Sequence, residues 1–391
     1  MILYVLGLFP APSETFVIRE LDELARRGLS VRVLRLRIGR GPSAIPVVDP
    51  TPRELLMAVM RAPLKTARLL IDGIRVTRGH WKNIAYWLLA LPKTVWAIQS
   101  AMSLGITRVH AHWAATPALV ARCIAQNCGI PFSFTAHAYD LFTSQSLFGA
   151  LYPHADAAIT VSRHNLEFIR GRWTDDAARR VRVVYCGLPG RFRKAPAGVR
   201  TNEMPRRIYS ACRFVETKGV DLLIRALPAV AEDFPDVRLI LFGEGPLRGN
   251  LEALVRRLNI LERVEFRGWT SESDMNAAYD GGGIWALPCR EAANGDRDGI
   301  PVSLLEAMAK ELTVVTTPIS GIPEVVEHAK NGWLVEPESA AALSRAFSTL
   351  FGNPALCRAL GEAAGRTIEM RFMIETTIGP LVEVLTRDAS H

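Results

Sequence analysis

The sequence lacks any apolar run long enough to cross a membrane. Its longest stretch without Asp, Glu, Lys or Arg, Cys123–Tyr139, has 17 residues, whereas a membrane-spanning helix needs about 20. Met1–Pro12 is apolar but has no basic leading segment, so we expect a first β-strand there and not a secretory signal. We therefore expect a cytoplasmic protein that is soluble or lies on a membrane surface.

Paired cysteines are also missing. The chain has 6 cysteines, and only Cys123 and Cys128 lie close together, with no second pair to complete a zinc site. This dispersion favours free thiols in a reducing compartment. His110 and His112 lie on one predicted strand, and we expect their side chains to point to opposite faces, where they could not share a metal. The sequence therefore predicts no metal site.

Common cofactor and nucleophile motifs are absent as well. Gly243–Gly249 has the spacing G-x-G-x-x-x-G, which differs from the dinucleotide fingerprint, so a nicotinamide or flavin is not expected. The sequence has no Walker phosphate loop, no G-x-S-x-G nucleophile elbow and no metalloprotease His-Glu motif. We expect no bound cofactor.

What the chain does contain is a repeated alternation of apolar strands and helices. Its 391 residues, 49% of them hydrophobic, suffice for two domains with separate cores. The alternation predicts two Rossmann-like, doubly wound parallel-sheet α/β domains at 1–190 and 202–373, joined by a linker at 191–201. A helical tail follows at 374–391. The predicted strands are Ile2–Leu8, Val31–Leu36, Arg108–Ala111, Phe132–Thr135, Ala158–Val161, Val181–Tyr185, Arg207–Ala211, Val237–Gly243, Val264–Gly268, Ile284–Pro288, Thr313–Thr317 and Gly332–Val335.

Charge is distributed unevenly between the two halves. Residues 1–200 carry a net charge of +15 and residues 201–391 a net charge of −7, which together give the overall +8. A basic first half suggests an anionic partner, either a nucleic acid or a membrane surface. Its basic residues interleave with amphipathic helices and match no known nucleic-acid-binding motif, so we expect no nucleic acid partner.

Residues 52–104 form a predicted helical insertion within the first domain. The segment is basic, and Arg61, Lys65, Arg68 and Arg75 share one helical face, whereas Leu64, Ala67, Ile71 and Ile74 share another. Tryptophans follow at positions 81, 87 and 96. A basic, tryptophan-bearing amphipathic segment can lie in a membrane interface. The alternative is an ordinary surface hairpin whose tryptophans belong to the core.

Residues 284–324 form the strongest candidate site. They predict a short strand, an acidic loop, a helix from Val302–Ser303, a buried strand, and a second helix over 323–329. Helices that follow parallel strands direct unpaired backbone N–H groups to one edge of the sheet, where phosphates bind. Nearby carboxylates would suit the hydroxyl groups of a nucleotide sugar.

Several side chains could act at this edge. Arg213 and Lys218 follow the first strand of the second domain and could neutralise a diphosphate, or they could be a solvated pair beside a helix. Glu306 could bind a hydroxyl group, or it could close a capping box with Ser303. Asp298 lies in a loop that no cap explains, although Glu291 and Asp296 share that loop.

Two further residues complete the candidate set. Gly321 could let the backbone approach a phosphate. His137 follows a buried strand of the first domain in F-T-A-H, where it could donate a hydrogen bond or act as an acid or base. A lone histidine at a strand end can equally be structural.

These residues together resemble glycosyltransferase family 4. The similar motifs are R-F-V-E-T-K-G-V-D-L-L at 213–223, L-F-G-E-G-P-L-R at 241–248, D-G-I-P-V-S-L-L-E-A-M-A at 298–309 and T-P-I-S-G-I-P-E-V-V at 317–326. Weaker likeness is found in S-E-T-F at 13–16, H-A-H-W at 110–113 and F-T-A-H at 134–137. The branch it resembles builds bacterial exopolysaccharide and lipopolysaccharide on lipid carriers.

The resemblance implies a GT-B fold, in which the two domains face each other across a cleft, and a retaining, metal-independent sugar transfer. It implies that Arg213 and Lys218 hold the donor diphosphate and that Glu306 binds the ribose. Gly243, Gly321 and the backbone at Ser303, Leu304 and Leu305 would also bind the nucleotide. His137 would approach the donor sugar, and residues 374–391 would cross back to the first domain.

The sequence departs from the family pattern at Asp298. The family has a glutamate there, and aspartate is one methylene shorter, so the contact with the donor sugar is changed. This departure motivates an alternative, a catalytically inactive GT-B subunit that binds nucleotide in a polysaccharide assembly complex. The expected partners of an active enzyme are a nucleotide-sugar donor, a lipid-linked glycan acceptor and an anionic membrane surface.

Overall fold

The computed structural model describes residues 1–11, 14–41, 43–77, 80–143, 146–173, 179–192 and 205–387. The chain forms two compact units: Met1–Gly187 together with the segment from Thr377 onward, and Leu188–Thr376. Their boundaries differ by a few residues from the predicted 190 and 373, because Leu188 pairs with Met373 in an isolated parallel bridge. Most of the predicted linker at 191–201 lies outside the described residues.

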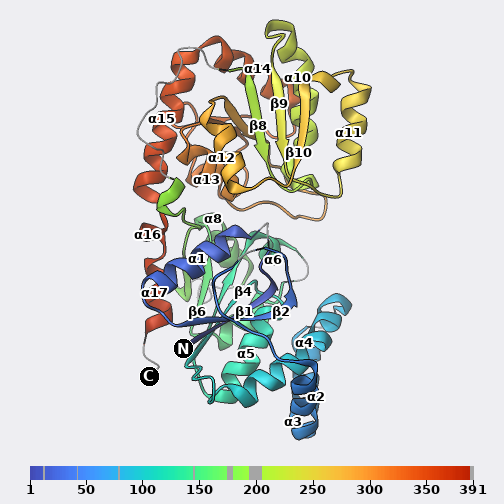
Figure 1. Cartoon of the computed structure of the whole chain (residues 1–391), viewed down its shortest axis with the longest axis vertical. Coiled ribbons are helices and arrows are strands. Elements are labelled where there is room, and N and C mark those ends of the chain that lie inside the picture. Colours follow the sequence, from blue (N-terminus) through green and yellow to red (C-terminus); the bar gives the residue numbers. More distant parts are fainter. Residues whose placement is uncertain are drawn as a thin grey trace. The chain divides into compact units, whose positions relative to one another are not determined.

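The first unit is built on a parallel sheet of 7 strands in the order β3-β2-β1-β4-β5-β6-β7. The central strands are almost entirely buried, as expected for a sheet covered on both faces. Helices flank the sheet (Figure 1). The strands are β1 (Ile2–Phe9), β2 (Val31–Ile38), β3 (Val47–Val48), β4 (Arg108–His112), β5 (Phe132–Ala136), β6 (Ala157–Thr160) and β7 (Val181–Val183).

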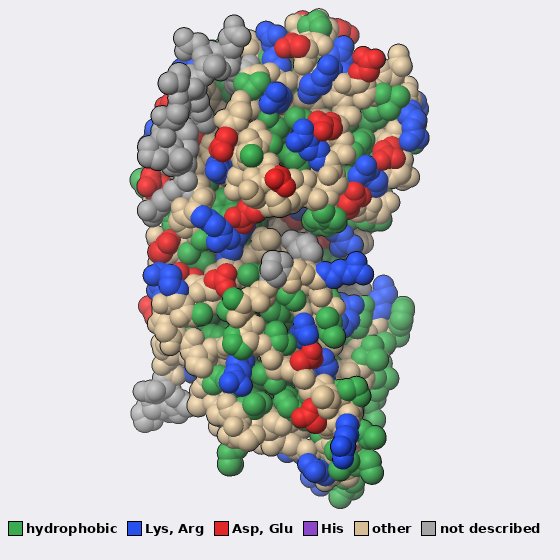
Figure 2. Space-filling model, viewed as in Figure 1, with side chains coloured by type: hydrophobic (Ala, Val, Ile, Leu, Met, Phe, Trp, Pro, Cys, Tyr) green, Lys and Arg blue, Asp and Glu red, His purple; other side chains and the backbone are tan. Residues whose placement is uncertain are grey.

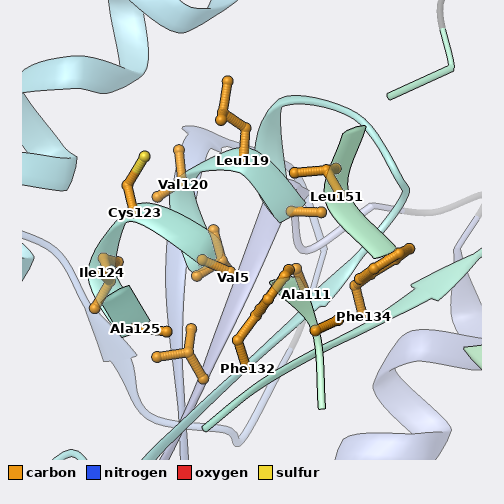
Figure 3. Packing of buried hydrophobic residues seen from close by; sticks show 14 of the residues in the cluster. Val5, Ala111, Leu119, Val120, Cys123, Ile124, Ala125, Phe132, Phe134 and Leu151 are labelled. Carbon is orange, nitrogen blue, oxygen red and sulfur yellow. The ribbon is translucent and has the colours of Figure 1, made fainter. Parts of the chain in front are cut away.

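The core of this unit lies between the sheet and α5 (Thr116–Cys128). Figure 3 shows Leu119 and Cys123 of this helix near Val5, Ala111 and Phe134 of the central strands. The remaining helices are α1 (Thr15–Arg26), α6 (Ala138–Phe142), α7 (Phe148–Leu151), α8 (Arg163–Arg172) and the C-terminal α17 (Gly379–Thr386). Arg108 of β4 donates a hydrogen bond to the backbone oxygen of Arg387 at 2.6 Å, which anchors the end of α17 in this unit.

Three helices form the insertion: α2 (Pro52–Arg61), α3 (Pro63–Val76) and α4 (Trp81–Ser100). Trp87 is fully buried in the core of the unit, against Gly73. Trp81, in contrast, is 72% exposed. The insertion is therefore a packed helical element with a core tryptophan and an exposed one.

The second unit is built on a parallel sheet of 6 strands in the order β10-β9-β8-β11-β12-β13. Its strands fall within one or two residues of the predicted ones. They are β8 (Arg207–Ala211), β9 (Arg238–Phe242), β10 (Val264–Gly268), β11 (Ile284–Leu287), β12 (Thr313–Thr316) and β13 (Trp333–Leu334). The helices are α10 (Val220–Asp233), α11 (Arg248–Arg257), α12 (Glu272–Asp280), α13 (Val302–Ala309), α14 (Ala340–Gly352), α15 (Pro354–Arg371) and α16 (Ile374–Thr377).

The predicted helix at 323–329 is wrong. The structure has a single 3-10 turn there, Ile322–Glu324. The Asn331 side chain accepts the N–H of Glu327 at 2.7 Å and donates to the carbonyl of Val325 at 2.9 Å. These bonds use the backbone groups that a continuing helix would need, so the chain turns towards β13 instead.

Candidate functional site

The loops after β8 and β11 meet at the C-terminal edge of the second sheet. Gly219 makes this contact possible, because it has a φ of +60° and a Cβ there would lie 2.1 Å from the carbonyl oxygen of Pro288. The N–H of Arg290 also donates to the carbonyl of Thr217 at 3.0 Å. Two loops far apart in sequence are thereby joined beside the start of α10.

Lys218 and Asp298 form an ion pair at this junction. Both side chains are largely buried, and the Cys289 thiol also donates to the Asp298 carboxylate at 3.5 Å. Burial alone would lower the pKa of Lys218, but the neighbouring Asp298 carboxylate outweighs it and raises the pKa. Lys218 is therefore a fixed positive charge.

Arg213 lies on the same side of the sheet, in the loop that follows β8. Its side chain is exposed and forms no ion pair with another described residue. Of these two cations, Lys218 is held by a carboxylate and Arg213 is available to a ligand.

The capping hypothesis for Glu306 is wrong. Helix α13 begins at Val302 with Pro301 as its N-cap residue, so Ser303 lies within the first turn and cannot close a capping box with Glu306. Glu306 is only 6% exposed, and its charge contributes to the raised pKa of Tyr279, whose main cause is burial. A buried carboxylate in the second turn of α13 has no capping role, which leaves binding as the remaining hypothesis.

Some of the backbone N–H groups at the start of α13 already form hydrogen bonds within the protein. The N–H groups of Leu304 and Leu305 both point to the carbonyl of Pro301, at 3.1 and 3.4 Å. Val302 and Ser303 occupy the first two helical positions, whose N–H groups have no carbonyl inside the helix to bind. These two groups are the better candidates for phosphate binding.

Of the two glycines in the predicted site, the fold requires a glycine at Gly243 but not at Gly321. Gly243 has a φ of +121°, and a Cβ there would lie 1.9 Å from the carbonyl oxygen of Cys212. Its glycine is thus required by the close approach of the loops after β8 and β9. Gly321 has a φ of −82°, which any residue can adopt. A close backbone approach to phosphate at Gly321 stays a prediction.

In the first unit, His137 belongs to a hydrogen-bonded chain that the sequence did not reveal. His112 Nδ1 lies 3.0 Å from His137 Nε2, and His112 Nε2 lies 2.9 Å from Glu20 Oε1. The Tyr4 hydroxyl also donates to Glu20 Oε1, at 3.0 Å. Burial first, and His112 second, hold the pKa of His137 well below its usual value, so its ring is neutral.

The expected orientation of His110 and His112 is wrong. Residues two apart on a strand share a face, and their ring centroids are 5.6 Å apart. Within the described part of the chain, the ligand atoms of Glu20, His110 and His112 lie within 4.8 Å of one another. Both His110 nitrogens, however, bind the hydroxyl groups of Ser133 and Thr135, at 2.8 and 3.1 Å. The observed arrangement is a hydrogen-bonded network.

Two carboxyl groups near this network have raised pKa values. Asp140 accepts the N–H groups of Ala114 and His137, but burial outweighs these bonds and raises its pKa to about 7. Burial also raises the pKa of Glu14 to about 7. Near neutral pH these two carboxyl groups are therefore not fixed negative charges.

Glu20 and His112 were not among the predicted site residues. A signal for His112 was present, because H-A-H places two histidines on one face of a strand beside the strand that precedes His137. Glu20 gave no such signal. It lies in α1, and only the packing of α1 against the sheet brings it to His112.

Comparison with known families assigns the class of protein. The family model for glycosyl transferases group 1 matches residues 192–367, and that for Glycosyltransferase Family 4 matches residues 13–189. Together they cover most of the chain, in the order of the two units. The chain therefore belongs to glycosyltransferase family 4.

Curated relatives resemble parts of the chain. WcaL of Escherichia coli K12, a glycosyltransferase assigned provisionally to colanic acid biosynthesis, is 37% identical over 40% of this chain and 40% of its own length. The amylovoran biosynthesis glycosyltransferase AmsK of Erwinia amylovora is 32% identical over 47% of this chain and 45% of its own length. The chain thus spans less than half the length of these relatives.

Solved structures with the same fold cover the whole chain. Anabaena HepE in complex with UDP-glucose superposes with a TM-score of 0.73 at 18% identity, over 99% of both chains. Sucrose-phosphate synthase from Thermosynechococcus elongatus superposes with a TM-score of 0.72 at 18% identity, over 98% of this chain and 99% of that one. The two parallel-sheet units therefore have the GT-B fold. In the described residues, none of the helices is both long and apolar enough to cross a membrane.

Proposed function

We propose that this protein transfers a sugar from a nucleotide diphosphate donor to a lipid-linked or polysaccharide acceptor in cell-surface glycan synthesis. The main support is the C-terminal edge of the second sheet, where exposed Arg213, buried Lys218 and the start of α13 lie next to one another in the topology. Cations and backbone N–H groups at such an edge suit a diphosphate. HepE, which shares the fold, was solved with UDP and with UDP-glucose.

The proposed reaction retains the anomeric configuration and needs no metal. The bond between the anomeric carbon and the diphosphate oxygen breaks, and the acceptor oxygen bonds to that carbon. The acceptor proton passes to the departing phosphate. Arg213 and Lys218 would stabilise the charge that develops on the diphosphate, as metal ions do in other transferases. Glu306 would bind the ribose, with Gly243, Gly321 and the α13 backbone at Ser303, Leu304 and Leu305 lining the nucleotide. His137 would act at the sugar.

Asp298 has a modified role in this proposal. Its carboxylate is paired with Lys218, so it cannot bind a sugar hydroxyl through the same oxygen without weakening that pair. We propose that it first orients Lys218 towards the diphosphate and reaches the sugar only through its second oxygen.

The experiment is a screen of nucleotide sugars by thermal shift, followed by transfer to a lipid-linked acceptor. A donor that binds only the folded state raises the melting temperature. We expect stabilisation by a UDP- or GDP-sugar, transfer that persists in EDTA, and a product with the anomeric configuration of the donor. An inverted product, or a transfer abolished by EDTA and restored by a divalent metal, would refute the mechanism.

The inactive subunit remains the second candidate, because Asp298 is tied to Lys218. It predicts nucleotide binding by calorimetry without turnover of any donor. Asp298→Glu separates the two possibilities. If the native chain is inactive and Asp298→Glu restores transfer, the inactive subunit is correct.

We further propose that the enzyme works as a peripheral protein on the cytoplasmic face of the inner membrane, where it docks through α2, α3 and α4. The apolar stripe of α3 faces away from the core: Leu64 is 77% exposed and Ile71 49%. Exposed apolar residues also lie on α2, at Met60, and on α4, at Leu89, which is 75% exposed. Apolar side chains on these helices thus remain uncovered within the unit (Figure 2).

Charge on these helices favours an anionic lipid surface as the partner. The two acidic residues of the segment are already engaged: Asp72 pairs with Arg122 at 3.4 Å, and Glu54 accepts the N–H of Thr51 at 2.7 Å. The basic residues beside the apolar stripe form no ion pair with described residues; they are Arg61, Lys65, Arg68 and Arg75. Each such charge contributes about 1 kcal/mol of attraction near an anionic membrane.

Vesicle flotation tests this docking face. We expect the protein to float with phosphatidylcholine vesicles that contain phosphatidylglycerol, and the double variant Leu64→Ser, Ile71→Ser to remain in the dense fraction. Leu261→Ser is the matched control, since Leu261 is 60% exposed in the second unit. Equal flotation of the double variant and the control would refute the docking face.

A further inference from the structure

The chain Glu20–His112–His137 has a proton arrangement that follows from its chemistry. An ionised carboxylate can only accept, so the 2.9 Å contact with Glu20 Oε1 requires that His112 carry its proton on Nε2. The His137 side chain faces the N–H of Asp140 in the capping box at the start of α6, so the ring nitrogen that is not in contact with His112 is the acceptor and Nε2 carries the proton. In the 3.0 Å contact, His137 Nε2 then donates to His112 Nδ1.

The surroundings hold each member in place. His112 is 1% exposed, and its ring stacks on that of His137 with centroids 5.3 Å apart. Tyr4, fully buried, donates to the same oxygen of Glu20 and so fixes the carboxylate. The N–H of His137 is held by the Asp140 carboxylate at 2.7 Å. The orientation of the His137 ring is thereby fixed by contacts that involve α1, β4 and the loop after β5.

We infer that Glu20 and His112 are positioning residues for the transfer reaction: through two hydrogen bonds in series they hold the His137 ring in one tautomer, with its proton on Nε2. The inference deepens the proposed function, on which it rests, because it specifies the form in which His137 meets the sugar. His137 Nδ1 is then an acceptor and not a donor.

A neutral acceptor suits the proposed reaction. Positive charge builds up at the anomeric carbon as the bond to the diphosphate breaks, and a nearby imidazolium would oppose it. The Glu20 carboxylate polarises His112 through its hydrogen bond, and His112 in turn makes the His137 ring more electron-rich. Burial favours the neutral ring as well, since it lowers the pKa of His137.

The tautomer can be observed directly. Long-range ¹H–¹⁵N spectra of the ¹⁵N-histidine-labelled protein distinguish the two neutral forms, and His137→Gln assigns the signals. We expect His137 in the Nε2–H form in the wild type and a mixture of tautomers in His112→Ala. Observation of the Nδ1–H form in the wild type would overturn the inference, whether or not the protein transfers sugar.

Kinetics then test the function of the chain. With UDP-glucose as the probe donor, we expect kcat to fall about 10-fold in Glu20→Gln and about 100-fold in His112→Ala, with unchanged affinity for UDP. Glu167→Gln is the matched control, because Glu167 is 63% exposed and pairs with Arg170, and it should keep kcat within about twofold. If Glu20→Gln, folded by circular dichroism, retains the wild-type kcat, the positioning role is refuted. If the wild type does not turn over UDP-glucose although His137 is in the Nε2–H form, UDP-glucose is not the donor. The hydrogen-bonded chain of Glu20, His112 and His137 would still be supported.

Discussion

The C-terminal edges of the two sheets share a topology but have opposite electrostatic character. In the first unit the edge is formed by His137, His112 and Glu20, whose polar atoms bind one another, and the nearby Glu14 and Asp140 have pKa values raised to about 7. In the second unit the edge contains the fixed charge of Lys218 and an exposed Arg213.

This difference matches the division of work in the proposed reaction. A diphosphate needs fixed positive charge, whereas a reacting sugar needs oriented neutral groups that do not oppose the charge on its anomeric carbon. One fold thus provides two environments, and the residues that follow each strand determine which one arises. Variants at each edge test this difference.

The largest effect is expected from Lys218→Ala. Removal of a cation that stabilises developing negative charge lowers kcat by roughly 10²–10³-fold. It also leaves the Asp298 carboxylate without its partner. Lys330→Ala is the control, since Lys330 is 76% exposed and only pairs with Glu327. Turnover of Lys218→Ala at the wild-type rate would show that the second edge does not hold the diphosphate.

Gly219→Ala should disrupt the contact between the two loops of the second edge. Its Cβ would lie 2.1 Å from the Pro288 carbonyl oxygen, in addition to the cost of a φ of +60°. Gly105→Ala isolates that second cost, because Gly105 has a φ of +64° with nothing within 4 Å of a Cβ. We expect about 1 kcal/mol of destabilisation for Gly105→Ala and about 3 kcal/mol for Gly219→Ala in urea unfolding. Equal losses would mean that the loops do not depend on this close approach.

Glu14→Gln tests the neutrality of the first edge through the pH dependence of stability. Burial raises the pKa of Glu14 from 4.5 to about 7, so the folded state binds a proton between these values that the unfolded state has released. The contribution of Glu14 to stability is complete below pH 4.5 and is lost as the pH rises through 7.

We therefore expect the wild type to lose more stability than Glu14→Gln between pH 5 and pH 8, by on the order of 2 kcal/mol. Thermal unfolding at a series of pH values measures the difference. Parallel curves for the two proteins would mean that Glu14 is ionised in the fold.

Much of the fold could be predicted because it depends on local patterns. β8 and β10 begin and end at the predicted residues. β8 is buried after its first residue, whereas β10 alternates apolar and charged residues as an edge strand. The helix at 323–329 could not be predicted from periodicity, because the side chain of Asn331 binds the backbone of Val325 and Glu327 and ends the turn. Ser303 matched a capping pattern by spacing alone, and the actual start of α13 at Val302 removes that role.

The candidate site was predictable residue by residue but not as a set of contacts. The sequence placed Arg213, Lys218 and Asp298 after strands of one sheet, and the family patterns gave them roles. It could not indicate that Asp298 pairs with Lys218, because that contact depends on the approach of two loops at Gly219. Glu20 had no signal at all, since a glutamate in an amphipathic helix is ordinarily solvated.

The sequence by itself determined two α/β units, the excess of positive charge in the first half and the positions at which polar residues follow buried strands. These features depend on composition and periodicity, which act over neighbouring residues. Only the tertiary structure decided which of those polar residues touch, which are buried, and where their protons reside. Burial and hydrogen bonding between distant segments set charge and tautomer, and both arise only once the sheet and its helices have packed.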